Sequence, residues 1–447
     1  MKYYPGLPQP YTYAGVVGIT VPTIALLRTV DKTTASSAQT LGYWTVGDRG
    51  DGVYELDAGD HTSPDDGGAV IVANDGGRWK LVSNGILNIK QYGAMGTGAS
   101  DDTTYIRNAF ANANFHTIYF PSGTYMTTGV INLTHTTTLF GDTSITSTIY
   151  MNHTGTGLSI KNINTYGLFI MNMQIAGNNV GIGIEIDSST EVSSHLKLSN
   201  LRIASVAYGL YSDPIVNFSM FDSCLDNVDF IQCTAVGWTL GGSQNSAIGC
   251  SFRICGYGIL LTQSSGGAAG SVLNCCTFIQ NTYDIVVNST YIRPLVFHGC
   301  WFEQTASLSV GKLTGGSEVY FVDLCFDKCL FQPAATALGN GVIDNFNYKG
   351  LVAFQHIMVY QNLYASAGLP SETSGDSNCI INRISCATIN GAGTVTALKD
   401  YTTNDKVNFY RLYQNRQYAN DAAAGVAGLT TGDVYYNTTV GAMSMKN

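Results

Sequence analysis

A short apolar pattern recurs through the middle of the chain at intervals of roughly 20 to 30 residues, the usual length of a solenoid repeat. Two apolar residues flank one variable residue in each copy, and four copies read Cys-x-Phe; the copies are Met173–Ile175, Leu201–Ile203, Val228–Phe230, Cys250–Phe252, Cys276–Phe278, Cys300–Phe302 and Cys329–Phe331. A glycine and a second apolar run follow several copies, as at Gly209, Gly237 and Gly258. Because the apolar positions alternate as in a strand, the sequence predicts an all-β parallel β-helix. Such a rod has long side faces that suit a polymer better than a small molecule.

The composition fits this fold and argues against several functions. Charged residues make up only 12% of the chain, while Gly (50) and Tyr (27) are plentiful, as expected of strands joined by turns. The net charge of −9 and the lack of any run of Lys or Arg argue against nucleic acid as the main partner. No stretch is apolar and long enough to span a membrane, and Pro22 interrupts the apolar residues 14–27, so we expect no membrane span and no export signal.

The cysteines are confined to one part of the chain. All eleven lie between Cys224 and Cys386, and four of them occupy the same position of the repeat. No two C-x-x-C pairs stand at zinc spacing, so we expect no metal site, and nothing indicates a cofactor. The sequence instead predicts a ladder of buried thiols that pack as small apolar residues. Reduced thiols without a disulfide framework favour folding in a cytoplasm.

The repeats and the segments around them divide the chain into five parts. Residues 1–39, rich in proline and aromatic residues at their start, are interpreted as an extended N-terminal arm. Residues 40–88 are predicted to form a small β unit with turns rich in Gly and Asp. The β-helix is assigned to residues 89–364. Residues 365–417 are expected to be a C-terminal β region for trimerisation or carbohydrate contact, and residues 418–447 a separate small module.

A short helix near residues 103–113 is predicted to close the open end of the β-helix, because exposed solenoid ends must be covered. Asp101 or Asp102 is a good N-cap for it. Behind the cap, apolar residues fall on one helical face, at Ile106, Ala109, Phe110 and Ala113.

Three pieces of the sequence resemble parts of known proteins. Gly93–Gly98, Asp101–Thr103 and Tyr119–Tyr125 resemble the first segment of pectate-lyase-like β-helix proteins. Residues 47–80 are similar to the unit that precedes this segment in bacteriophage tailspikes, and residues 421–445 are similar to a small module of phage tail proteins. In this order the pieces resemble a tailspike or capsule depolymerase.

The resemblance implies a right-handed parallel β-helix that forms a homotrimer on the virion tail, after folding in the host cytoplasm. It also implies attachment to a tail or baseplate protein, for which the N-terminal arm is the candidate. Such a protein binds, and usually cuts, a bacterial surface polysaccharide, either capsule or O-antigen. The resemblance transfers no catalytic residue.

Outward-pointing residues can be assigned from the repeat itself. If both apolar residues of each copy point inward, the residue between them points outward, because side chains alternate along a strand. This gives a central column of Gln174, Arg202, Asp229, Ser251, Thr277, Trp301 and Leu330. A trailing column follows at Ala176, Ala204, Ile231, Arg253, Ile279, Glu303 and Gln332. A leading column, before the repeat, contains Asp226, Ile248, Asn274, His298 and Asp327.

Four acids in these columns are candidates for catalysis. Glycoside hydrolysis needs one carboxylic acid to protonate the leaving oxygen and a second carboxylate as base or nucleophile. Glu303 ranks first because it follows Trp301 in a region poor in charge, and Asp229, Asp327 and Asp226 come next. Neither Glu303 with Asp327, offset by five residues along adjoining coils, nor Asp229 with Glu303, about 14 Å apart across three coils, is clearly at working distance. In a trimer a neighbouring chain could supply the second acid.

Substrate binding is assigned to Trp301, Arg253, His298 and Arg202. A Trp face stacks on sugar rings, although the same side chain could be a subunit contact, and Arg253 could simply pair with Asp229 or Glu303. Two alternatives to hydrolysis stay open. A polysaccharide lyase would use Arg253 and His298 to neutralise a uronate and abstract its proton. A spike without catalytic activity would only bind its receptor.

Overall fold

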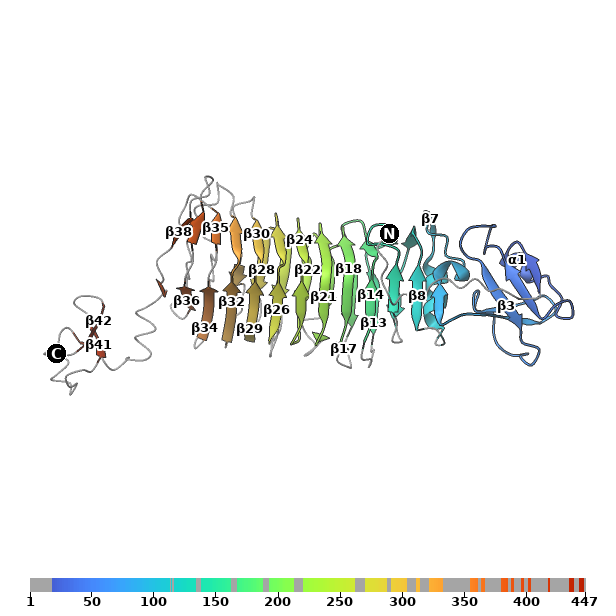
Figure 1. The fold of residues 1–447 in the computed structure, drawn as a ribbon, viewed down its shortest axis with the longest axis horizontal. Helices are drawn as coiled ribbons and strands as arrows, with labels where there is room; N and C mark the ends of the chain where they lie inside the picture. The colour runs from blue at the N-terminus through green and yellow to red at the C-terminus, as the bar shows by residue number, and fades with distance from the viewer. Residues whose placement is uncertain are drawn as a thin grey trace.

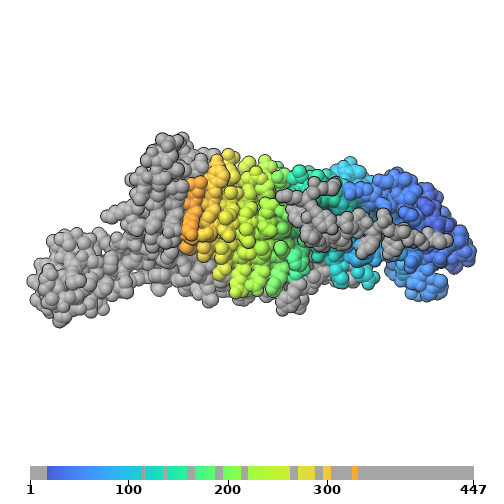
Figure 2. Space-filling view, viewed as in Figure 1, coloured from blue at the N-terminus to red at the C-terminus, as the bar shows by residue number. Residues whose placement is uncertain are grey.

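The protein is a solenoid of stacked strands behind a small N-terminal sheet (Figure 1). The structure is a computed structural model that describes the side chains of residues 18–112, 114, 116–133, 138–158, 167–186, 195–212, 220–261, 270–286, 295–303 and 325–330. Beyond these it gives the backbone of the further strands named below. In the space-filling view the described coils follow one another along the long axis as successive bands of colour (Figure 2).

The N-terminal sheet has the strand order β1-β2-β3-β5-β4, with β1 Ile19–Val21, β2 Ser37–Thr40, β3 Gly52–Leu56, β4 Val70–Val72 and β5 Arg78–Leu81. The short helix α1 (Ile24–Leu27) follows β1. Its buried side chains join those of the sheet in one core, formed by Ile24, Leu27, Ala38, Tyr43, Tyr54, Ile71, Ala73 and Trp79. The sheet therefore starts well before the predicted boundary at residue 40. Residues 1–17 of the predicted arm lie outside the described residues.

One carboxylate organises the loop between β2 and β3. Asp48 accepts hydrogen bonds from the backbone N–H groups of Tyr43 (3.0 Å), Trp44 (2.8 Å), Thr45 (3.0 Å) and Gly50 (2.9 Å). Burial alone would raise the pKa of Asp48, but these four donors together outweigh it and hold the pKa below its usual 3.8. The loop is thus built around an ionised carboxylate.

We expect Asp48→Ala to destabilise the N-terminal sheet by about 2 kcal/mol, because several backbone donors lose their acceptor. The matched change Asp57→Ala removes an acceptor of only one backbone N–H bond, from Gly59, and should cost under about 0.5 kcal/mol. Denaturant unfolding followed by tryptophan fluorescence compares the two variants. Because the folded-state pKa of Asp48 is lowered, its contribution is present above pH 3.8 and disappears as pH falls below that value. An equal effect of both substitutions would contradict the assigned role of Asp48.

The predicted helix is present as α2 (Thr103–Ala111), at the start of the solenoid. Its buried residues include Ile106, Ala109 and Phe110, as predicted, whereas residue 113 lies outside the described residues. The two candidate N-cap residues bond different backbone groups. Asp101 Oδ1 accepts from the Thr103 backbone N–H (3.0 Å), while Asp102 turns inward and accepts from Met95 N (2.7 Å) and Gly96 N (3.0 Å).

Each coil of the solenoid contributes two short strands to one large sheet, so that this sheet consists of two files. The first file contains β6 Ile86–Asn88, β8 Thr117–Phe120, β11 Thr138–Gly141, β14 Phe169–Met171, β18 Lys197–Ala204, β21 Cys224–Ile231, β23 Ser246–Ile248, β26 Ser271–Asn274, β29 Tyr291–His298, β32 Phe321–Asp327, β34 Phe354–Tyr360 and β36 Cys379–Ile384. The second file contains β7 Thr97–Asp101, β9 Gly123–Thr127, β12 Ser147–Met151, β15 Gln174–Ala176, the second halves of β18 and β21, β24 Ser251–Arg253, β27 Thr277–Ile279, β30 Trp301–Glu303, β33 Leu330–Gln332, β35 Leu363–Ala365 and β37 Ala387–Ile389. The 3-10 helix η1 (Ile89–Tyr92) lies between β6 and β7.

A separate eight-stranded sheet forms another face of the solenoid, in the order β10 Ile131–Leu133, β13 Thr156–Lys161, β16 Ile182–Asp187, β19 Tyr208–Ser212, β22 Val236–Leu240, β25 Tyr257–Leu261, β28 Tyr283–Val287 and β31 Gly311–Leu313. Its strands pair in parallel from coil to coil, as do those of both files. The fold is therefore the predicted parallel β-helix.

The remaining strands lie outside this regular pattern. They are β17 Ser193–Ser194, β20 Met220–Phe221, β38 Val395–Ala397, β39 Tyr401–Thr402, β40 Gln417–Tyr418, β41 Val434–Asn437 and β42 Ala442–Met445. Parallel pairing continues through β36 and β37, past the predicted boundary at residue 364, and β38 and β39 then pair antiparallel with them. A three-stranded sheet of β40, β41 and β42 lies mostly within the predicted module 418–447.

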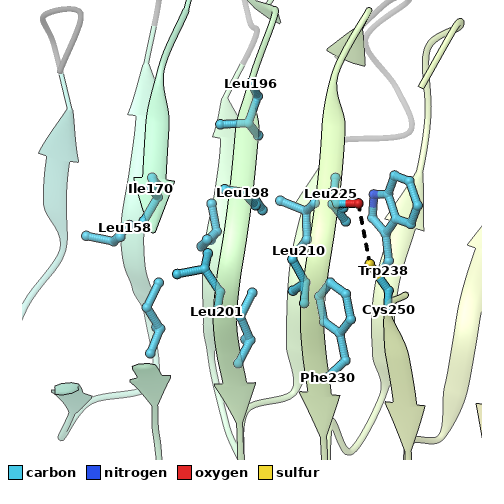
Figure 3. Close-up of a cluster of buried hydrophobic side chains, with 14 of the residues drawn as sticks. Leu158, Ile170, Leu196, Leu198, Leu201, Leu210, Leu225, Phe230, Trp238 and Cys250 are labelled. Atoms are coloured by element: carbon cyan, nitrogen blue, oxygen red, sulfur yellow. Dashed lines mark hydrogen bonds between the residues drawn. The ribbon is translucent and has the colours of Figure 1, made fainter. Parts of the chain in front are cut away.

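The repeat noticed in the sequence is the inner lining of the second file. Strand register aligns Ile175, Ile203, Phe230, Phe252, Phe278, Phe302 and Phe331 in one column. Four of these rings stack almost parallel, with centroids 4.9 Å apart from Phe230 to Phe252, 4.9 Å from Phe252 to Phe278 and 4.7 Å from Phe278 to Phe302. Figure 3 shows how leucines of successive strands point into the same interior.

The predicted thiol ladder lies beside this stack. Cys250, Cys276, Cys300 and Cys329 are all buried and carry no disulfide. Each thiol donates to a backbone carbonyl of the preceding coil, as Cys250 Sγ does to Leu225 O at 3.6 Å (Figure 3). Cysteine therefore supplies a small apolar side chain whose weak donor is satisfied.

The glycines that follow several copies of the repeat form a column in the eight-stranded sheet. Strand register brings Gly183, Gly209, Gly237 and Gly258 close together on successive strands of the eight-stranded sheet. A Cβ on Gly209 would lie 2.4 Å from Gly237 O and 2.7 Å from the Phe230 ring. No side chain fits there, so glycine lets this sheet approach the aromatic stack.

Candidate functional site

Strand register confirms that each outward column predicted from the sequence is continuous. The central column runs through Gln174, Arg202, Asp229, Ser251, Thr277, Trp301 and Leu330, and the trailing column through Ala176 to Gln332 in the same way. The leading column connects Asp226, Ile248, Asn274, His298 and Asp327. The leading column lies on the first file of the large sheet, and the central and trailing columns lie on the second file.

A corner separates the leading column from the other two. One residue of each coil there has a left-handed backbone, at Asn172, Asn200, Asn227, Gly249, Cys275, Gly299 and Lys328. The first three of these form a side-chain ladder, in which Asn200 Nδ2 donates to Asn172 Oδ1 (3.2 Å) and Asn227 Nδ2 to Asn200 Oδ1 (2.8 Å). Asn and Gly tolerate this conformation best. The sequence signal, an Asn or Gly just before five of the seven repeats, was available and was not used.

His298 and Asp327 form a direct pair within the leading column. His298 Nδ1 lies 2.7 Å from Asp327 Oδ2, although the residues belong to adjoining coils. The His298 side chain is 40% exposed, whereas Asp327 Oδ1 is buried without a hydrogen-bond partner among the described residues. The contact to Nδ1 fixes the ring orientation and leaves Nε2 as the atom available to a substrate or a water.

Glu303 and Trp301 lie on the same coil as His298, beyond the corner. Trp301 is 37% exposed, which is unusual for so large an aromatic ring, and Glu303 is half-buried on β30. Among the described residues, the Glu303 carboxylate has no hydrogen bond and no ion pair.

Asp229 forms ion pairs with two arginines. Arg253 forms a two-pronged contact with it, with Nε 3.1 Å from Oδ1 and Nη2 2.5 Å from Oδ2. From the preceding coil, Arg202 Nη2 lies 3.4 Å from the same Oδ2. The possible pairing of Arg253 with Asp229 is therefore present, and the second arginine was not foreseen. A carboxylate bonded in this way is poorly suited to donate a proton or to attack a sugar.

Asp226 stands apart from Asp229 although only two residues separate them. The left-handed Asn227 lies between them and places Asp226 on the leading side of the corner. Asp226 is exposed, and its Oδ2 accepts a hydrogen bond from Ser199 at 3.4 Å. The corner at Asn227 thus places the two acids on different files of the large sheet.

A polar cluster missed by sequence reasoning lies at the start of the leading column. Tyr119 and Phe140 precede Asp226 in that column, and their rings stack with centroids 5.0 Å apart. The Tyr119 hydroxyl donates to Asp142, which also accepts from Ser122 N at 2.8 Å. Burial, followed by the bond to Asp142, raises the pKa of Tyr119 to about 12. No repeat was recognised this early in the chain, so the column was not extended to it.

Within the described ranges, no three His, Cys, Asp or Glu side chains lie close enough to hold a metal ion. No helix in this part of the chain is long and apolar enough to cross a membrane.

Comparison with known families agrees with this architecture. Residues 20–84 match the family described as the phage tail protein small four-stranded β-sheet domain. Residues 86–183 match the family described as rhamnogalacturonase A/epimerase, pectate lyase-like. Both matches agree with a small β-sheet followed by a β-helix, in the order in which this chain has them. A tail fibre protein of a Mu-like prophage of Haemophilus influenzae, described as defective, is 35% identical over 116 residues, which are 25% of this chain and 18% of that protein.

Solved tailspike structures share the fold at low sequence identity. The enzymatically active domain of tailspike protein 2 of bacteriophage CBA120 has a TM-score of 0.60 and 17% identity, and the match covers 83% of this chain and 57% of that one. The tailspike protein gp49 of Acinetobacter baumannii bacteriophage Fri1, a capsular polysaccharide depolymerase, has a TM-score of 0.53 and 14% identity over 88% of this chain and 78% of that one. The chain thus spans little more than half of the first of these structures and a fifth of the tail fibre protein.

Proposed function

We propose that this chain is a component of a phage tail that binds and depolymerises a bacterial surface polysaccharide, capsule or O-antigen, by hydrolysing glycosidic bonds. One observation carries the proposal: an exposed Trp301, a Glu303 without a partner among the described residues and the His298–Asp327 pair lie on two adjoining coils of the large sheet. Cleavage of a sugar chain needs an acid and a base at the glycosidic bond, and an aromatic side chain can stack on a sugar ring. The low-identity tailspike structures, one of which is a capsular polysaccharide depolymerase, agree with this function.

Each residue has a defined role in this proposal. Glu303 acts as the general acid that protonates the leaving glycosidic oxygen. His298 takes the proton of the attacking water at Nε2, while one Asp327 carboxylate oxygen bonds His298 and the other is buried. Asp327 orients the ring and stabilises its positive charge, as a carboxylate does beside a catalytic histidine.

A lyase is the second candidate, favoured by the same outward Nε2 of His298. In that case His298 would abstract the proton next to a uronate carboxyl, and the leaving oxygen would depart with formation of a carbon–carbon double bond. The product would absorb in the near ultraviolet.

The test is incubation of the purified protein with a panel of bacterial surface polysaccharides, while reducing ends and near-ultraviolet absorbance are recorded together. We expect reducing ends to rise without absorbance. A rise of both signals would replace hydrolysis by elimination. A polymer that is bound but keeps its size would contradict both reactions and leave a spike that only binds.

We expect His298→Ala to lower kcat about 100-fold, with little change in KM, because it removes proton transfer and not binding. Asp327→Asn should have an effect in the same direction, since an amide no longer fixes the ring or its charge. His195→Ala is the matched control: His195 is exposed on another coil and should leave the rate unchanged. Full activity of His298→Ala would remove this residue from the mechanism.

A further inference from the structure

We propose that Arg202 and Arg253 form a subsite for an anionic substituent of the polysaccharide, a carboxylate or a phosphate. This inference rests on the proposed function, because it names the class of polymer that the same face would bind. It assigns Asp229 to positioning: this carboxylate holds the two guanidinium groups and does not react.

The local charge carries the first step of the argument. Two arginines share one carboxylate, which leaves one uncompensated positive charge in a chain with a net charge of −9. The neighbouring central-column residues on either side, Gln174 and Ser251, are uncharged. The nearest acids of the outward columns face elsewhere or lie further along the rod. Asp226 lies across the corner and bonds Ser199, and Glu303 is two coils beyond Arg253.

The hydrogen-bond donors give the second step. Arg253 spends Nε and Nη2 on Asp229. Among the described residues, the guanidinium of Arg202 has only one contact, at 3.4 Å, and most of its five N–H donors stay free. A planar group with free donors is suited to a two-pronged contact with a carboxylate or phosphate.

Exposure gives the third step. The side chains of Arg202 and Arg253 are 35% and 38% exposed, while Asp229 beneath them is 19% exposed. A surface ion pair contributes only about 0–1 kcal/mol, so stability alone gives little reason for a second arginine here. Arg202 and Arg253 lie on the coils before and after Asp229 and are both partly exposed. Together they can bind an anion that neutralises the remaining positive charge.

The test uses affinity electrophoresis of the full chain in gels that contain polygalacturonate, polyribitol phosphate or neutral dextran. The Glu303→Gln background keeps the polymer intact during the run. We expect retardation by at least one of the two anionic polymers and none by dextran, with weaker retardation at higher salt. The polymer that retards the protein identifies the substituent as carboxylate or phosphate.

In the same gels, Arg202→Gln should weaken binding about tenfold. Lys197→Gln removes one exposed positive charge from the same strand, β18, and should change binding far less. Equal losses for both variants would mean that only net charge matters, and no loss for Arg202→Gln, or no retardation by either anionic polymer, would overturn the subsite. Cleavage of a neutral polymer by the wild-type chain would also overturn it while leaving the depolymerase function intact.

Discussion

Glu303→Gln is expected to lower kcat on the cleaved polysaccharide by 10²–10⁴-fold, because the amide cannot donate a proton to the leaving oxygen. The substitution is close to isosteric, so the fold and the adjoining Trp301 platform should be retained. KM should change little, since Glu303 has no partner among the described residues whose loss would rearrange the site. Initial rates of reducing-end formation over a range of polymer concentrations separate the two constants.

The matched control is Glu185→Gln on the other sheet. Glu185 is also half-buried, and its Oε2 accepts a hydrogen bond from Thr156 Oγ1 at 2.9 Å, but it lies in β16 and not in any of the three columns. We expect this variant to keep wild-type activity. If Glu303→Gln were as active as Glu185→Gln, the general acid would have to be sought elsewhere. A substrate with an activated leaving group should partly rescue Glu303→Gln, because such a group needs no proton.

Phe252→Ala is expected to destabilise the solenoid by about 3–5 kcal/mol. Phe252 is fully buried, and its ring is stacked on both sides, by Phe230 and Phe278 at 4.9 Å each. Truncation leaves a cavity in the middle of the stack that neighbouring coils cannot fill, because their positions are set by strand pairing. It also removes the ring that faces Gly237 across the interior.

Chemical unfolding followed by the fluorescence of the buried Trp238, next to Gly237, reports on this region. Phe169→Ala makes the same truncation at an outward position that is 36% exposed, and should cost less than about 1 kcal/mol. Because each coil contacts only its neighbours, the loss should be largest for probes near Phe252. A loss similar to that of Phe169→Ala would show that the aromatic column is not a main source of stability.

The sequence predicted the fold through the regular spacing of one column. The aligned Cys and Phe positions are buried because every coil uses the same inward positions. A repeat along the sequence therefore predicts a column of side chains in the structure. The N-terminal start of the sheet was placed too late because β1 and β2 are short and carry no repeat. The extent of the coils past residue 364 was missed for a related reason: β36 and β37 lack the Cys-x-Phe pattern.

The site was predicted less completely. The columns predict which residues are neighbours on adjoining coils, but they do not predict the side-chain conformations that decide which of them are in contact. His298 and Asp327 were placed on adjoining coils of one column, yet their contact depends on the ring rotating toward the acid. Arg253 with Asp229 was one of two pairings considered, and the approach of Arg202 from the other side could not be read from spacing alone. Attachment through the N-terminal arm and assembly as a homotrimer stay predictions.

The strand pairing has a mechanical consequence for a rod of this kind. The strands cross the long axis of the rod, so the hydrogen bonds between coils run along it (Figure 1). A pull along the axis passes through every junction between coils in series, and the junction with the weakest pairing yields first. The rod would then lengthen in steps of one coil, while the coils on either side of the break keep their bonds.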